Sequence, residues 1–135
     1  MATMQVELVS PERVVFSGDA TQVITRTVGG GEIAFLPGHA PFVGALTENH
    51  TRITLADGTQ LDAAVHGGFV QVSGNKVSIL SDIAELGDDI DRGRAFSAME
   101  RAEAILRHEH DAEAIAALSR AHARLNATGG VSGAH

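Results

Sequence analysis

Histidine, arginine and acidic side chains are the residues of this sequence whose types could perform chemistry. The chain has seven histidines and no cysteine, so thiolate nucleophiles and disulfides are excluded. His108 and His110 are two positions apart and would diverge on a helix, so we do not expect zinc there. Gly29-Gly30-Gly31-Glu32 lacks the lysine and the spacing of a phosphate-binding loop, and no Ser/His/Asp set or paired-carboxylate motif is present. The sequence therefore predicts neither a catalytic residue nor a metal site.

The charge balance excludes further classes of protein. The formal net charge is −7, and Lys76 is the sole lysine, whereas a nucleic-acid binder usually carries a basic stripe. Trp and Tyr are absent, so stacking platforms for bases are not expected either. No run approaches the roughly 18 apolar residues of a membrane span, and the lack of cysteine fits a reducing cytoplasm. The six basic residues after position 87 are all arginines, whose planar groups can bind carboxylates and phosphates through two hydrogen bonds.

Residues 1–87 show the alternation and turn spacing of short β-strands. Asp57-Gly58 is a strong hairpin signal, because this pair tolerates positive φ. Gly67-Gly68 indicates a bulge or a close backbone approach, which we favour over ligand contact. The pattern predicts an antiparallel sandwich or barrel of nine or ten strands. The expected strands are 5–9, 14–16, 21–27, 32–36, 42–46, 52–55, 60–65, 69–72 and 76–80.

Residues 88–128 show helical periodicity instead. Asp88 or Asp89 is expected to cap a helix that runs to about Arg107, and Asp111 to cap a second helix that reaches about Asn126. The short link predicts an antiparallel hairpin, and 129–135 is expected to be a flexible tail. The expected facing stripes are Ala95, Ala98, Ala102 and Ile105 on the first helix, and Ala114, Leu118, Ala121 and Leu125 on the second.

The hairpin should be only weakly held. Its facing stripes are mostly alanine, which buries little area, and Gly93 costs about 1 kcal/mol relative to alanine inside a helix. Helices of this length are marginal alone, so a ligand or partner could shift them. The residues from Leu86 to Asp89 are then expected to be the hinge between the two units.

Several motifs occur together in this chain and resemble one family, the epsilon subunit of F-type ATP synthases. They span residues 5–125 with the strand pattern between them. Any one is weak, but the set is specific. The motifs are Phe16-Ser17-Gly18, Gly31-Glu32-Ile33-Ala34-Phe35-Leu36-Pro37-Gly38-His39-Ala40-Pro41, Gly67-Gly68-Phe69-Val70-Gln71-Val72, Ser81-Asp82-Ile83-Ala84-Glu85 (with serine where the family has alanine), Ile90-Asp91-Arg92-Gly93-Arg94-Ala95 and Arg120-Ala121-His122-Ala123-Arg124-Leu125.

The resemblance implies a ten-stranded antiparallel β-sandwich over 1–87 and a regulatory helical hairpin over 88–128. In the family the sandwich binds the gamma subunit and sits on the ring of c subunits, so it couples rotor rotation to the catalytic head. The hairpin can fold against the sandwich, or extend toward the catalytic beta and alpha subunits and inhibit ATP hydrolysis. In some members ATP binds the folded form as a regulatory ligand. No cofactor is required.

The resemblance also implies site residues. Arginines of the two helices could converge on phosphates, whereas the alternative is a helix-start charge at Asp91 with Arg94 and Arg120 in surface ion pairs. Arg120 and Arg124 are also the implied inhibitory contact with the beta subunit. Glu32 is the implied c-ring contact, or else a solvated turn residue, and His39 is implied at the gamma interface. The implied nucleotide-binding residues are Glu85, Ile90, Asp91, Arg94, Ala95, Arg120 and Arg124.

We therefore expect a non-catalytic stalk subunit, peripheral on the cytoplasmic side of a bacterial plasma membrane and attached to it only through the complex. The alternative from a different class is a free-standing nucleotide-sensing adaptor. An enzyme is the third possibility, and no residues support it.

Overall fold

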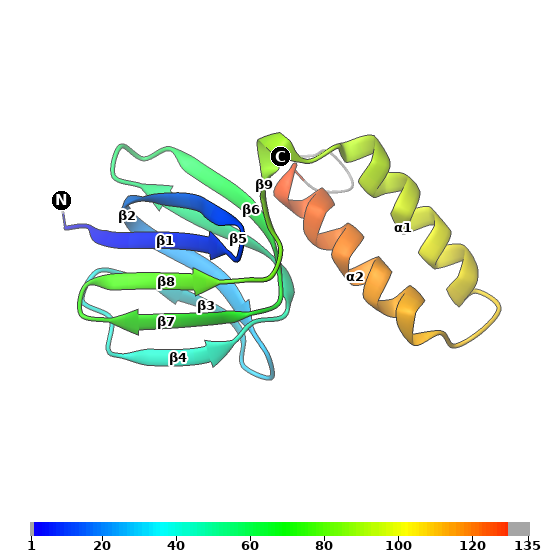
Figure 1. Cartoon of the computed structure of the whole chain (residues 1–135), viewed down its shortest axis with the longest axis horizontal. Coiled ribbons are helices and arrows are strands. Elements are labelled where there is room, and N and C mark those ends of the chain that lie inside the picture. The colour runs from blue at the N-terminus through cyan, green and yellow to red at the C-terminus, as the bar shows by residue number, and fades with distance from the viewer. Residues whose placement is uncertain (1, 130–135) are drawn as a thin grey trace.

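A β-sandwich and a pair of helices lie end to end in the computed structural model, which describes residues 2–129 (Figure 1). The helices are α1 (Arg92–Leu106) and α2 (Ala112–Ala127), and a short 3-10 turn, Gly87–Asp89, connects them to the sandwich. The strands are β1 (Met4–Ser10), β2 (Arg13–Thr27), β3 (Gly31–Phe35), β4 (Phe42–Ala45), β5 (Glu48–Leu55), β6 (Gln60–His66), β7 (Phe69–Ser73), β8 (Lys76–Leu80) and β9 (Ala84–Leu86).

The strands form one continuous mixed sheet that folds into two layers. Its order is β4-β7-β8-β1-β2-β5-β6-β9, with β3 also paired to β2. β1 and β8 run parallel, with Val6 opposite Val77, and the other pairs are antiparallel. The expectation of ten antiparallel strands is therefore wrong in number and in direction, while the sandwich itself is confirmed.

The strands also differ from the nine expected ranges, because β2 joins two of them into one long strand. Ser17-Gly18-Asp19, expected to be a turn, is extended backbone in the middle of β2, where Gly18 lies opposite Val6 and Asp19 opposite Gln5. Pairing with β1 thus overrides the local turn signal. The short strand β9 was not expected, and it is held by its pairing to β6 with Ala84 opposite Val65.

The core lies between the two layers. Successive side chains of a strand point to opposite faces of the sheet, so every second residue faces the core. Val6, Val23, Ile53 and Ile79 are among its completely buried side chains. Each such side chain contributes roughly 1.5–3 kcal/mol to the free energy of unfolding. The sandwich therefore carries most of the apolar core of the chain.

Gly68 explains the glycine pair before β7. Its φ is +107°, and a Cβ atom there would collide with the Leu80 carbonyl oxygen. The Gly68 carbonyl accepts a hydrogen bond from Leu46 N at 2.8 Å. The pair is thus a close backbone approach, as expected, and only glycine fits it.

Asp91 caps α1, because its Oδ1 atom accepts a hydrogen bond from Arg94 N at 3.0 Å. The expected cap at Asp88 or Asp89 is therefore wrong: those residues form the 3-10 turn, which ends with Ile90 N donating to the Gly87 carbonyl. Asp111 caps α2 as expected, through Ala114 N at 2.9 Å. The first helix thus begins at Arg92, which leaves a longer hinge.

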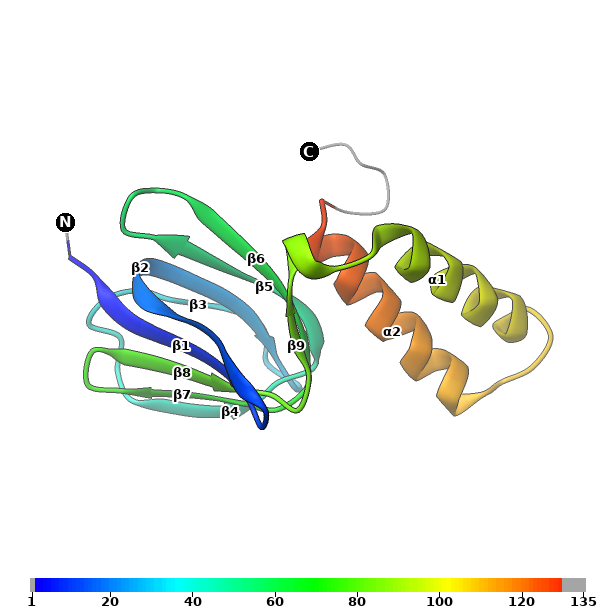
Figure 2. The same cartoon turned by 45° about the horizontal axis from the view of Figure 1, so that its top comes forward.

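The two helices lie side by side, and α2 packs against β5 and β6 of the sandwich (Figure 2). Ala95, Met99, Ala121 and Leu125 are buried between the helices. Ile105, expected in this seam, is 42% exposed. Ala123 and Ala127 form a second seam against Ala64 of β6 and Ile90. Both seams consist mainly of alanine, so they bury little apolar area.

Over residues 2–129, no helix has the length and apolar character needed to cross a membrane. Of the expected tail, only Gly129 is described, and 130–135 lie outside the described residues.

Candidate functional site at the hinge

A polar cleft of about 380 Å³ lies at the hinge, between the end of the sandwich and the two helices. Residues from β9, the 3-10 turn, α1 and α2 contribute to its wall, so both sides of the hinge are represented. Six of the seven residues expected to bind nucleotide line it. The lining residues are Glu85, Asp89, Ile90, Asp91, Arg94, Ala95, Ala98, Arg101 and Arg124.

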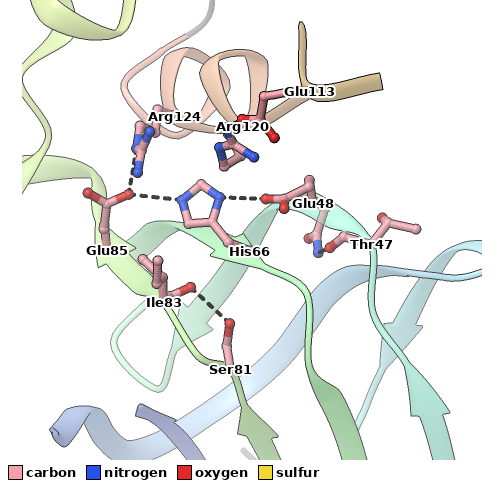
Figure 3. A network of polar contacts seen from close by, with 10 residues as sticks. Thr47, Glu48, His66, Ser81, Ile83, Glu85, Glu113, Arg120 and Arg124 are labelled. Atoms are coloured by element: carbon pink, nitrogen blue, oxygen red, sulfur yellow. Dashed lines mark hydrogen bonds and ion pairs between the residues drawn. The ribbon is translucent and has the colours of Figure 1, made fainter. Parts of the chain in front are cut away.

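Glu85 is the residue that connects the sandwich to α2. Its Oε1 atom accepts a hydrogen bond from Arg124 Nε at 2.7 Å and lies 2.9 Å from His66 Nε2 (Figure 3). The other ring nitrogen of His66, Nδ1, lies 2.6 Å from Glu48 Oε2. We call these four side chains, Glu48, His66, Glu85 and Arg124, the hinge network. They come from β5, β6, β9 and α2, so one run of contacts joins the sheet to the helix.

The electrostatics of the hinge network keep Glu85 ionised. The hydrogen bond from His66 lowers the pKa of Glu85 most, burial opposes this, and Arg124 lowers it further, to about 2. The carboxylate is therefore a permanent negative charge at neutral pH. It fixes Arg124 at the edge of the cleft.

Three arginines line the cleft together with the carboxylates of Glu85, Asp89 and Asp91, and the arginines are the groups that could bind an anion. Arg94 and Arg101 are seven positions apart on α1, which puts them on one face of that helix, and Arg124 reaches the cleft from α2. Asp91 is partly committed, because its side chain caps α1. The cleft offers guanidinium donors for phosphate oxygens, and its chemistry is binding rather than bond breaking.

Arg120, Glu32 and His39 lie elsewhere. Arg120 does not line the cleft, and its Nη2 atom donates to Glu113 Oε1 at 2.7 Å on the same helix. Glu32 is exposed at the start of β3, where it lines a groove shared with Ser119 of α2.

His39 is fixed in its turn. Its ring packs edge-on against Phe35, with 4.9 Å between centroids, and its Nδ1 atom donates to the Ala40 carbonyl at 2.7 Å. These two contacts hold the ring in place within the turn. His39 lies in the connection between β3 and β4, which is at the end of the sandwich away from the helices (Figure 1).

Sequence reasoning missed His66, Glu48 and Arg101. Arg101 could have been found from its seven-residue spacing to Arg94. His66 gave no signal, because its partners are 18 and 19 positions away and meet it only through strand pairing. In the part of the chain that the structure describes, no group of three or more His, Asp or Glu side chains is placed to hold a metal ion.

Two family models match consecutive parts of the chain. Residues 3–87 match the ATP synthase delta/epsilon chain beta-sandwich domain, and 88–129 match the long alpha-helix domain of the same chains. The ATP synthase epsilon chain of Streptomyces griseus is 44% identical over 126 residues, covering 93% of this chain and 95% of its own. That of Streptomyces avermitilis is 48% identical over 103 residues, 76% of this chain and 82% of its own.

A solved structure has the same fold. It is a chain in the cryo-EM structure of the Euglena gracilis mitochondrial ATP synthase, comprising OSCP, F1 and c-ring. The TM-score is 0.81 at 23% identity, over 94% of this chain and 81% of that chain. With both units matched in order by one family, the chain belongs to the ATP synthase delta/epsilon chains, as an epsilon-type, non-catalytic subunit of the central stalk.

Proposed function

We propose that this stalk subunit transmits rotation from the c-ring to the catalytic head through gamma, and that its helical region regulates ATP hydrolysis. The observation that supports this best is the match of both units, the sandwich and the helices, to one family. The sandwich would be the part that binds gamma and the c-ring. Residues 88–128 would be the regulatory unit, an antiparallel hairpin that can leave the sandwich.

The outer face of β4, β7 and β8 is the proposed surface for gamma. Phe69 is 58% exposed and lies between Ala45 of β4 and Leu80 of β8, and Val43 on the same face is 70% exposed. An apolar groove of about 610 Å³ begins beside Phe69 and Leu80. Contiguous exposed apolar surface of this kind is typical of a protein interface. His39, fixed against Phe35 and Phe42 just before the start of β4, is the proposed gamma contact at the opposite end of β4 from Ala45.

Co-purification with gamma tests this surface. Phe69→Asp should abolish co-purification, because it puts a charge into an apolar contact, whereas Gln60→Asp, at an exposed position on β6, should leave it unchanged. If Phe69→Asp co-purifies like the unaltered chain, the surface is wrongly chosen. If the unaltered chain never associates with gamma, the free-standing nucleotide-sensing adaptor becomes the better assignment.

We propose that Glu32 faces the c-ring and that the subunit is peripheral on the cytoplasmic side of a bacterial plasma membrane, held there by the complex. Glu32 is exposed, follows the Val28–Gly30 turn and lies opposite Arg26 in the β2–β3 pair. A photocrosslinker at position 32 in the assembled complex should capture a c subunit. Capture of alpha or beta subunits only would contradict this placement.

The hinge cleft is the proposed nucleotide site, with ATP as a regulatory ligand. A ligand that contacts Glu85 on the sandwich and Arg94 on α1 touches both sides of the hinge. It would bind more tightly when α2 packs on the sandwich, which we call the docked arrangement, than when the helices are released, and so would favour docking. In calorimetric titration with ATP, Arg94→Ala should weaken binding. Arg107→Ala removes the same charge at the end of α1, outside the cleft, and should not. Equal, negligible heats for all three chains would remove the ATP proposal.

We propose that the released hairpin inhibits ATP hydrolysis by presenting Arg120 and Arg124 to the beta subunit. In the docked arrangement both arginines are occupied, Arg120 by Glu113 and Arg124 by Glu85. Removing residues 88–135 should therefore raise ATP hydrolysis by the assembled complex. Unchanged hydrolysis would show that the hairpin is not an inhibitor in this protein.

A further inference from the structure

Two adjoining polar grooves lie beside α2, on the side of that helix away from the hinge cleft. Their volumes are about 320 Å³ and about 410 Å³, and they share Glu32 and Asn126. Ser119, His122 and Asn126 line them from α2, at spacings of three and four positions that put them on one helix face. Arg124, which lines the hinge cleft, projects from the other face. We call this continuous depression the β3–α2 groove.

The β3–α2 groove has walls from both units of the chain. Strands β2, β3, β5 and β6 form one side and the floor, with Glu32 near the start of β3, and α2 forms the other side. The turn between β2 and β3 lies at the end of the sandwich where the helices are attached, which brings Glu32 near α2 (Figure 1). The complete groove therefore exists only in the docked arrangement.

Charged side chains in the floor of the groove are already paired, whereas the polar side chains of its rim are not. Asp62 Oδ1 accepts a hydrogen bond from Arg52 Nε at 2.9 Å and lies 2.7 Å from His50 Nε2. Between residues 2 and 129, no side-chain hydrogen bond or ion pair engages the rim residues Arg26, Glu32, Ser119, His122 and Asn126. The rim can therefore bind polar groups of a partner without breaking an internal contact.

The charge of the sandwich favours a cationic partner. Residues 1–87 contain nine acidic and four basic side chains, and Glu32 presents an exposed carboxylate at the rim. A carboxylate binds lysine or arginine through short, charge-assisted hydrogen bonds, and complementary charge also guides association. A second copy of this chain is a poor candidate, because each copy has a net charge of −7.

We propose that a polar loop of a c subunit, carrying a lysine or an arginine, occupies the β3–α2 groove, so that the rotor ring contacts α2 as well as Glu32. This inference rests on the proposed function, which puts Glu32 at the c-ring, and adds the helix to that contact. A ring that binds both walls of the groove binds the docked arrangement more tightly than the released one. The ring would thus hold the hairpin on the sandwich, whether or not the hinge cleft binds a nucleotide.

Photocrosslinkers in the assembled complex test the groove. Placed at the exposed positions 32 and 119, on its two walls, each should capture a c subunit, which mass spectrometry identifies. Position 97 is exposed on α1 and lies outside the groove, so it is the control and should capture none.

The outcomes separate this inference from the proposed function. Capture at position 32 without capture at position 119 overturns the groove but leaves the placement of Glu32 intact, whereas absence of c subunits at both positions contradicts that placement itself. Capture of alpha or beta subunits alone at position 119 also overturns the groove, because the ring would then not keep α2 docked. Equal capture of c subunits at position 97 would show that the contact does not depend on the groove, and overturns it too.

Asn126→Lys tests the charge of the loop, at an exposed position where the chain should still fold. With the photocrosslinker kept at position 119, the yield of the c-subunit product should fall by at least about threefold, because the new lysine would face another cation. Asn126→Gln keeps the side chain neutral, and Ser97→Lys adds the same charge to α1, so both should keep the yield of the unaltered chain. An unchanged yield for Asn126→Lys, or an equal loss for Asn126→Gln, overturns the cationic loop.

Discussion

At the scale of single residues, Glu85 serves two partners with one oxygen. Its Oε1 atom accepts from Arg124 and contacts His66, so both the docking of α2 and the wall of the hinge cleft depend on it. Arg124 lines the hinge cleft while it is paired with Glu85, so the cleft keeps this wall only as long as α2 stays on the sandwich.

Glu85→Gln should make folding less sensitive to acid. The pKa of Glu85 falls from 4.5 to about 2, first through His66 and then through Arg124, against burial. A pKa that is lower in the folded chain adds stability that is complete above pH 4.5 and is lost as pH falls toward 2. Unfolding free energies from urea titrations at about pH 6 and about pH 3 should differ less for Glu85→Gln than for the unaltered chain.

Glu100→Gln is the control for this experiment, because Glu100 is an exposed residue of α1. Its acid response should equal that of the unaltered chain. If Glu85→Gln loses as much stability in acid as the unaltered chain does, the contacts of the Glu85 carboxylate with His66 and Arg124 do not stabilise the fold.

At the scale of elements, the hinge lets the end of α2 lie very close to the sheet. Gly87 follows β9 and passes between β6 and the end of α2. A Cβ atom there would collide with the Ala127 carbonyl oxygen and lie 3.4 Å from that of Asp62. Glycine at this position therefore lets α2 approach the sheet closely enough for Arg124 to reach Glu85.

Gly87→Ala should push the end of α2 away from the sandwich. Overpacking of this kind typically costs about 1–3 kcal/mol, so amide hydrogen exchange in α2 should be at least about tenfold faster. Gly93→Ala is the matched control: its Cβ would meet only Asp91 Oδ1, at an ordinary 3.6 Å, and alanine favours the helix. Equal exchange in both variants would mean that close packing at Gly87 is unimportant.

The sequence predicts elements well where local pattern and tertiary pairing agree. The Asp57-Gly58 turn and the Asp111 cap are examples, since a few neighbouring residues determine each. It fails where a distant partner decides: Gly18 is extended because Val6 lies opposite it.

The candidate site shows the same limit. Arg94 and Asp91 could be found from a motif of neighbouring residues. Both line the hinge cleft, and Asp91 also caps α1. His66 could not be found in this way, because nothing near it in the sequence marks its two carboxylate partners. Sandwich pairing of β5, β6 and β9 is what brings them together.

At the scale of the whole molecule, the sandwich and the helices share little apolar contact. The main core contains residues of the sandwich only, and the apolar contact between the units consists of Ala64 with Ala123, Ala127 and Ile90. Such a junction can open without exposing much apolar surface. That is what a regulatory movement requires.

Residues 1–87 should therefore fold without the helices. We expect a single cooperative thermal transition by circular dichroism, with a melting temperature lowered by no more than about 8 °C, the equivalent of about 1–2 kcal/mol for a domain of this size. An unfolded fragment would show that the helical region is part of the folding unit and would argue against a movable hairpin.

The parallel pairing of β1 with β8 has a consequence for synthesis on the ribosome. β1 is an inner strand of the sheet, between β2 and β8. Its pairing with β8, in which Gln5 lies opposite Lys76, can form only after β8 has been synthesised. Such non-local pairing is slow, because the intervening chain must be ordered first. The sandwich can close only when nearly all of its residues have emerged, and the helices, which follow, dock last onto a surface that is already formed.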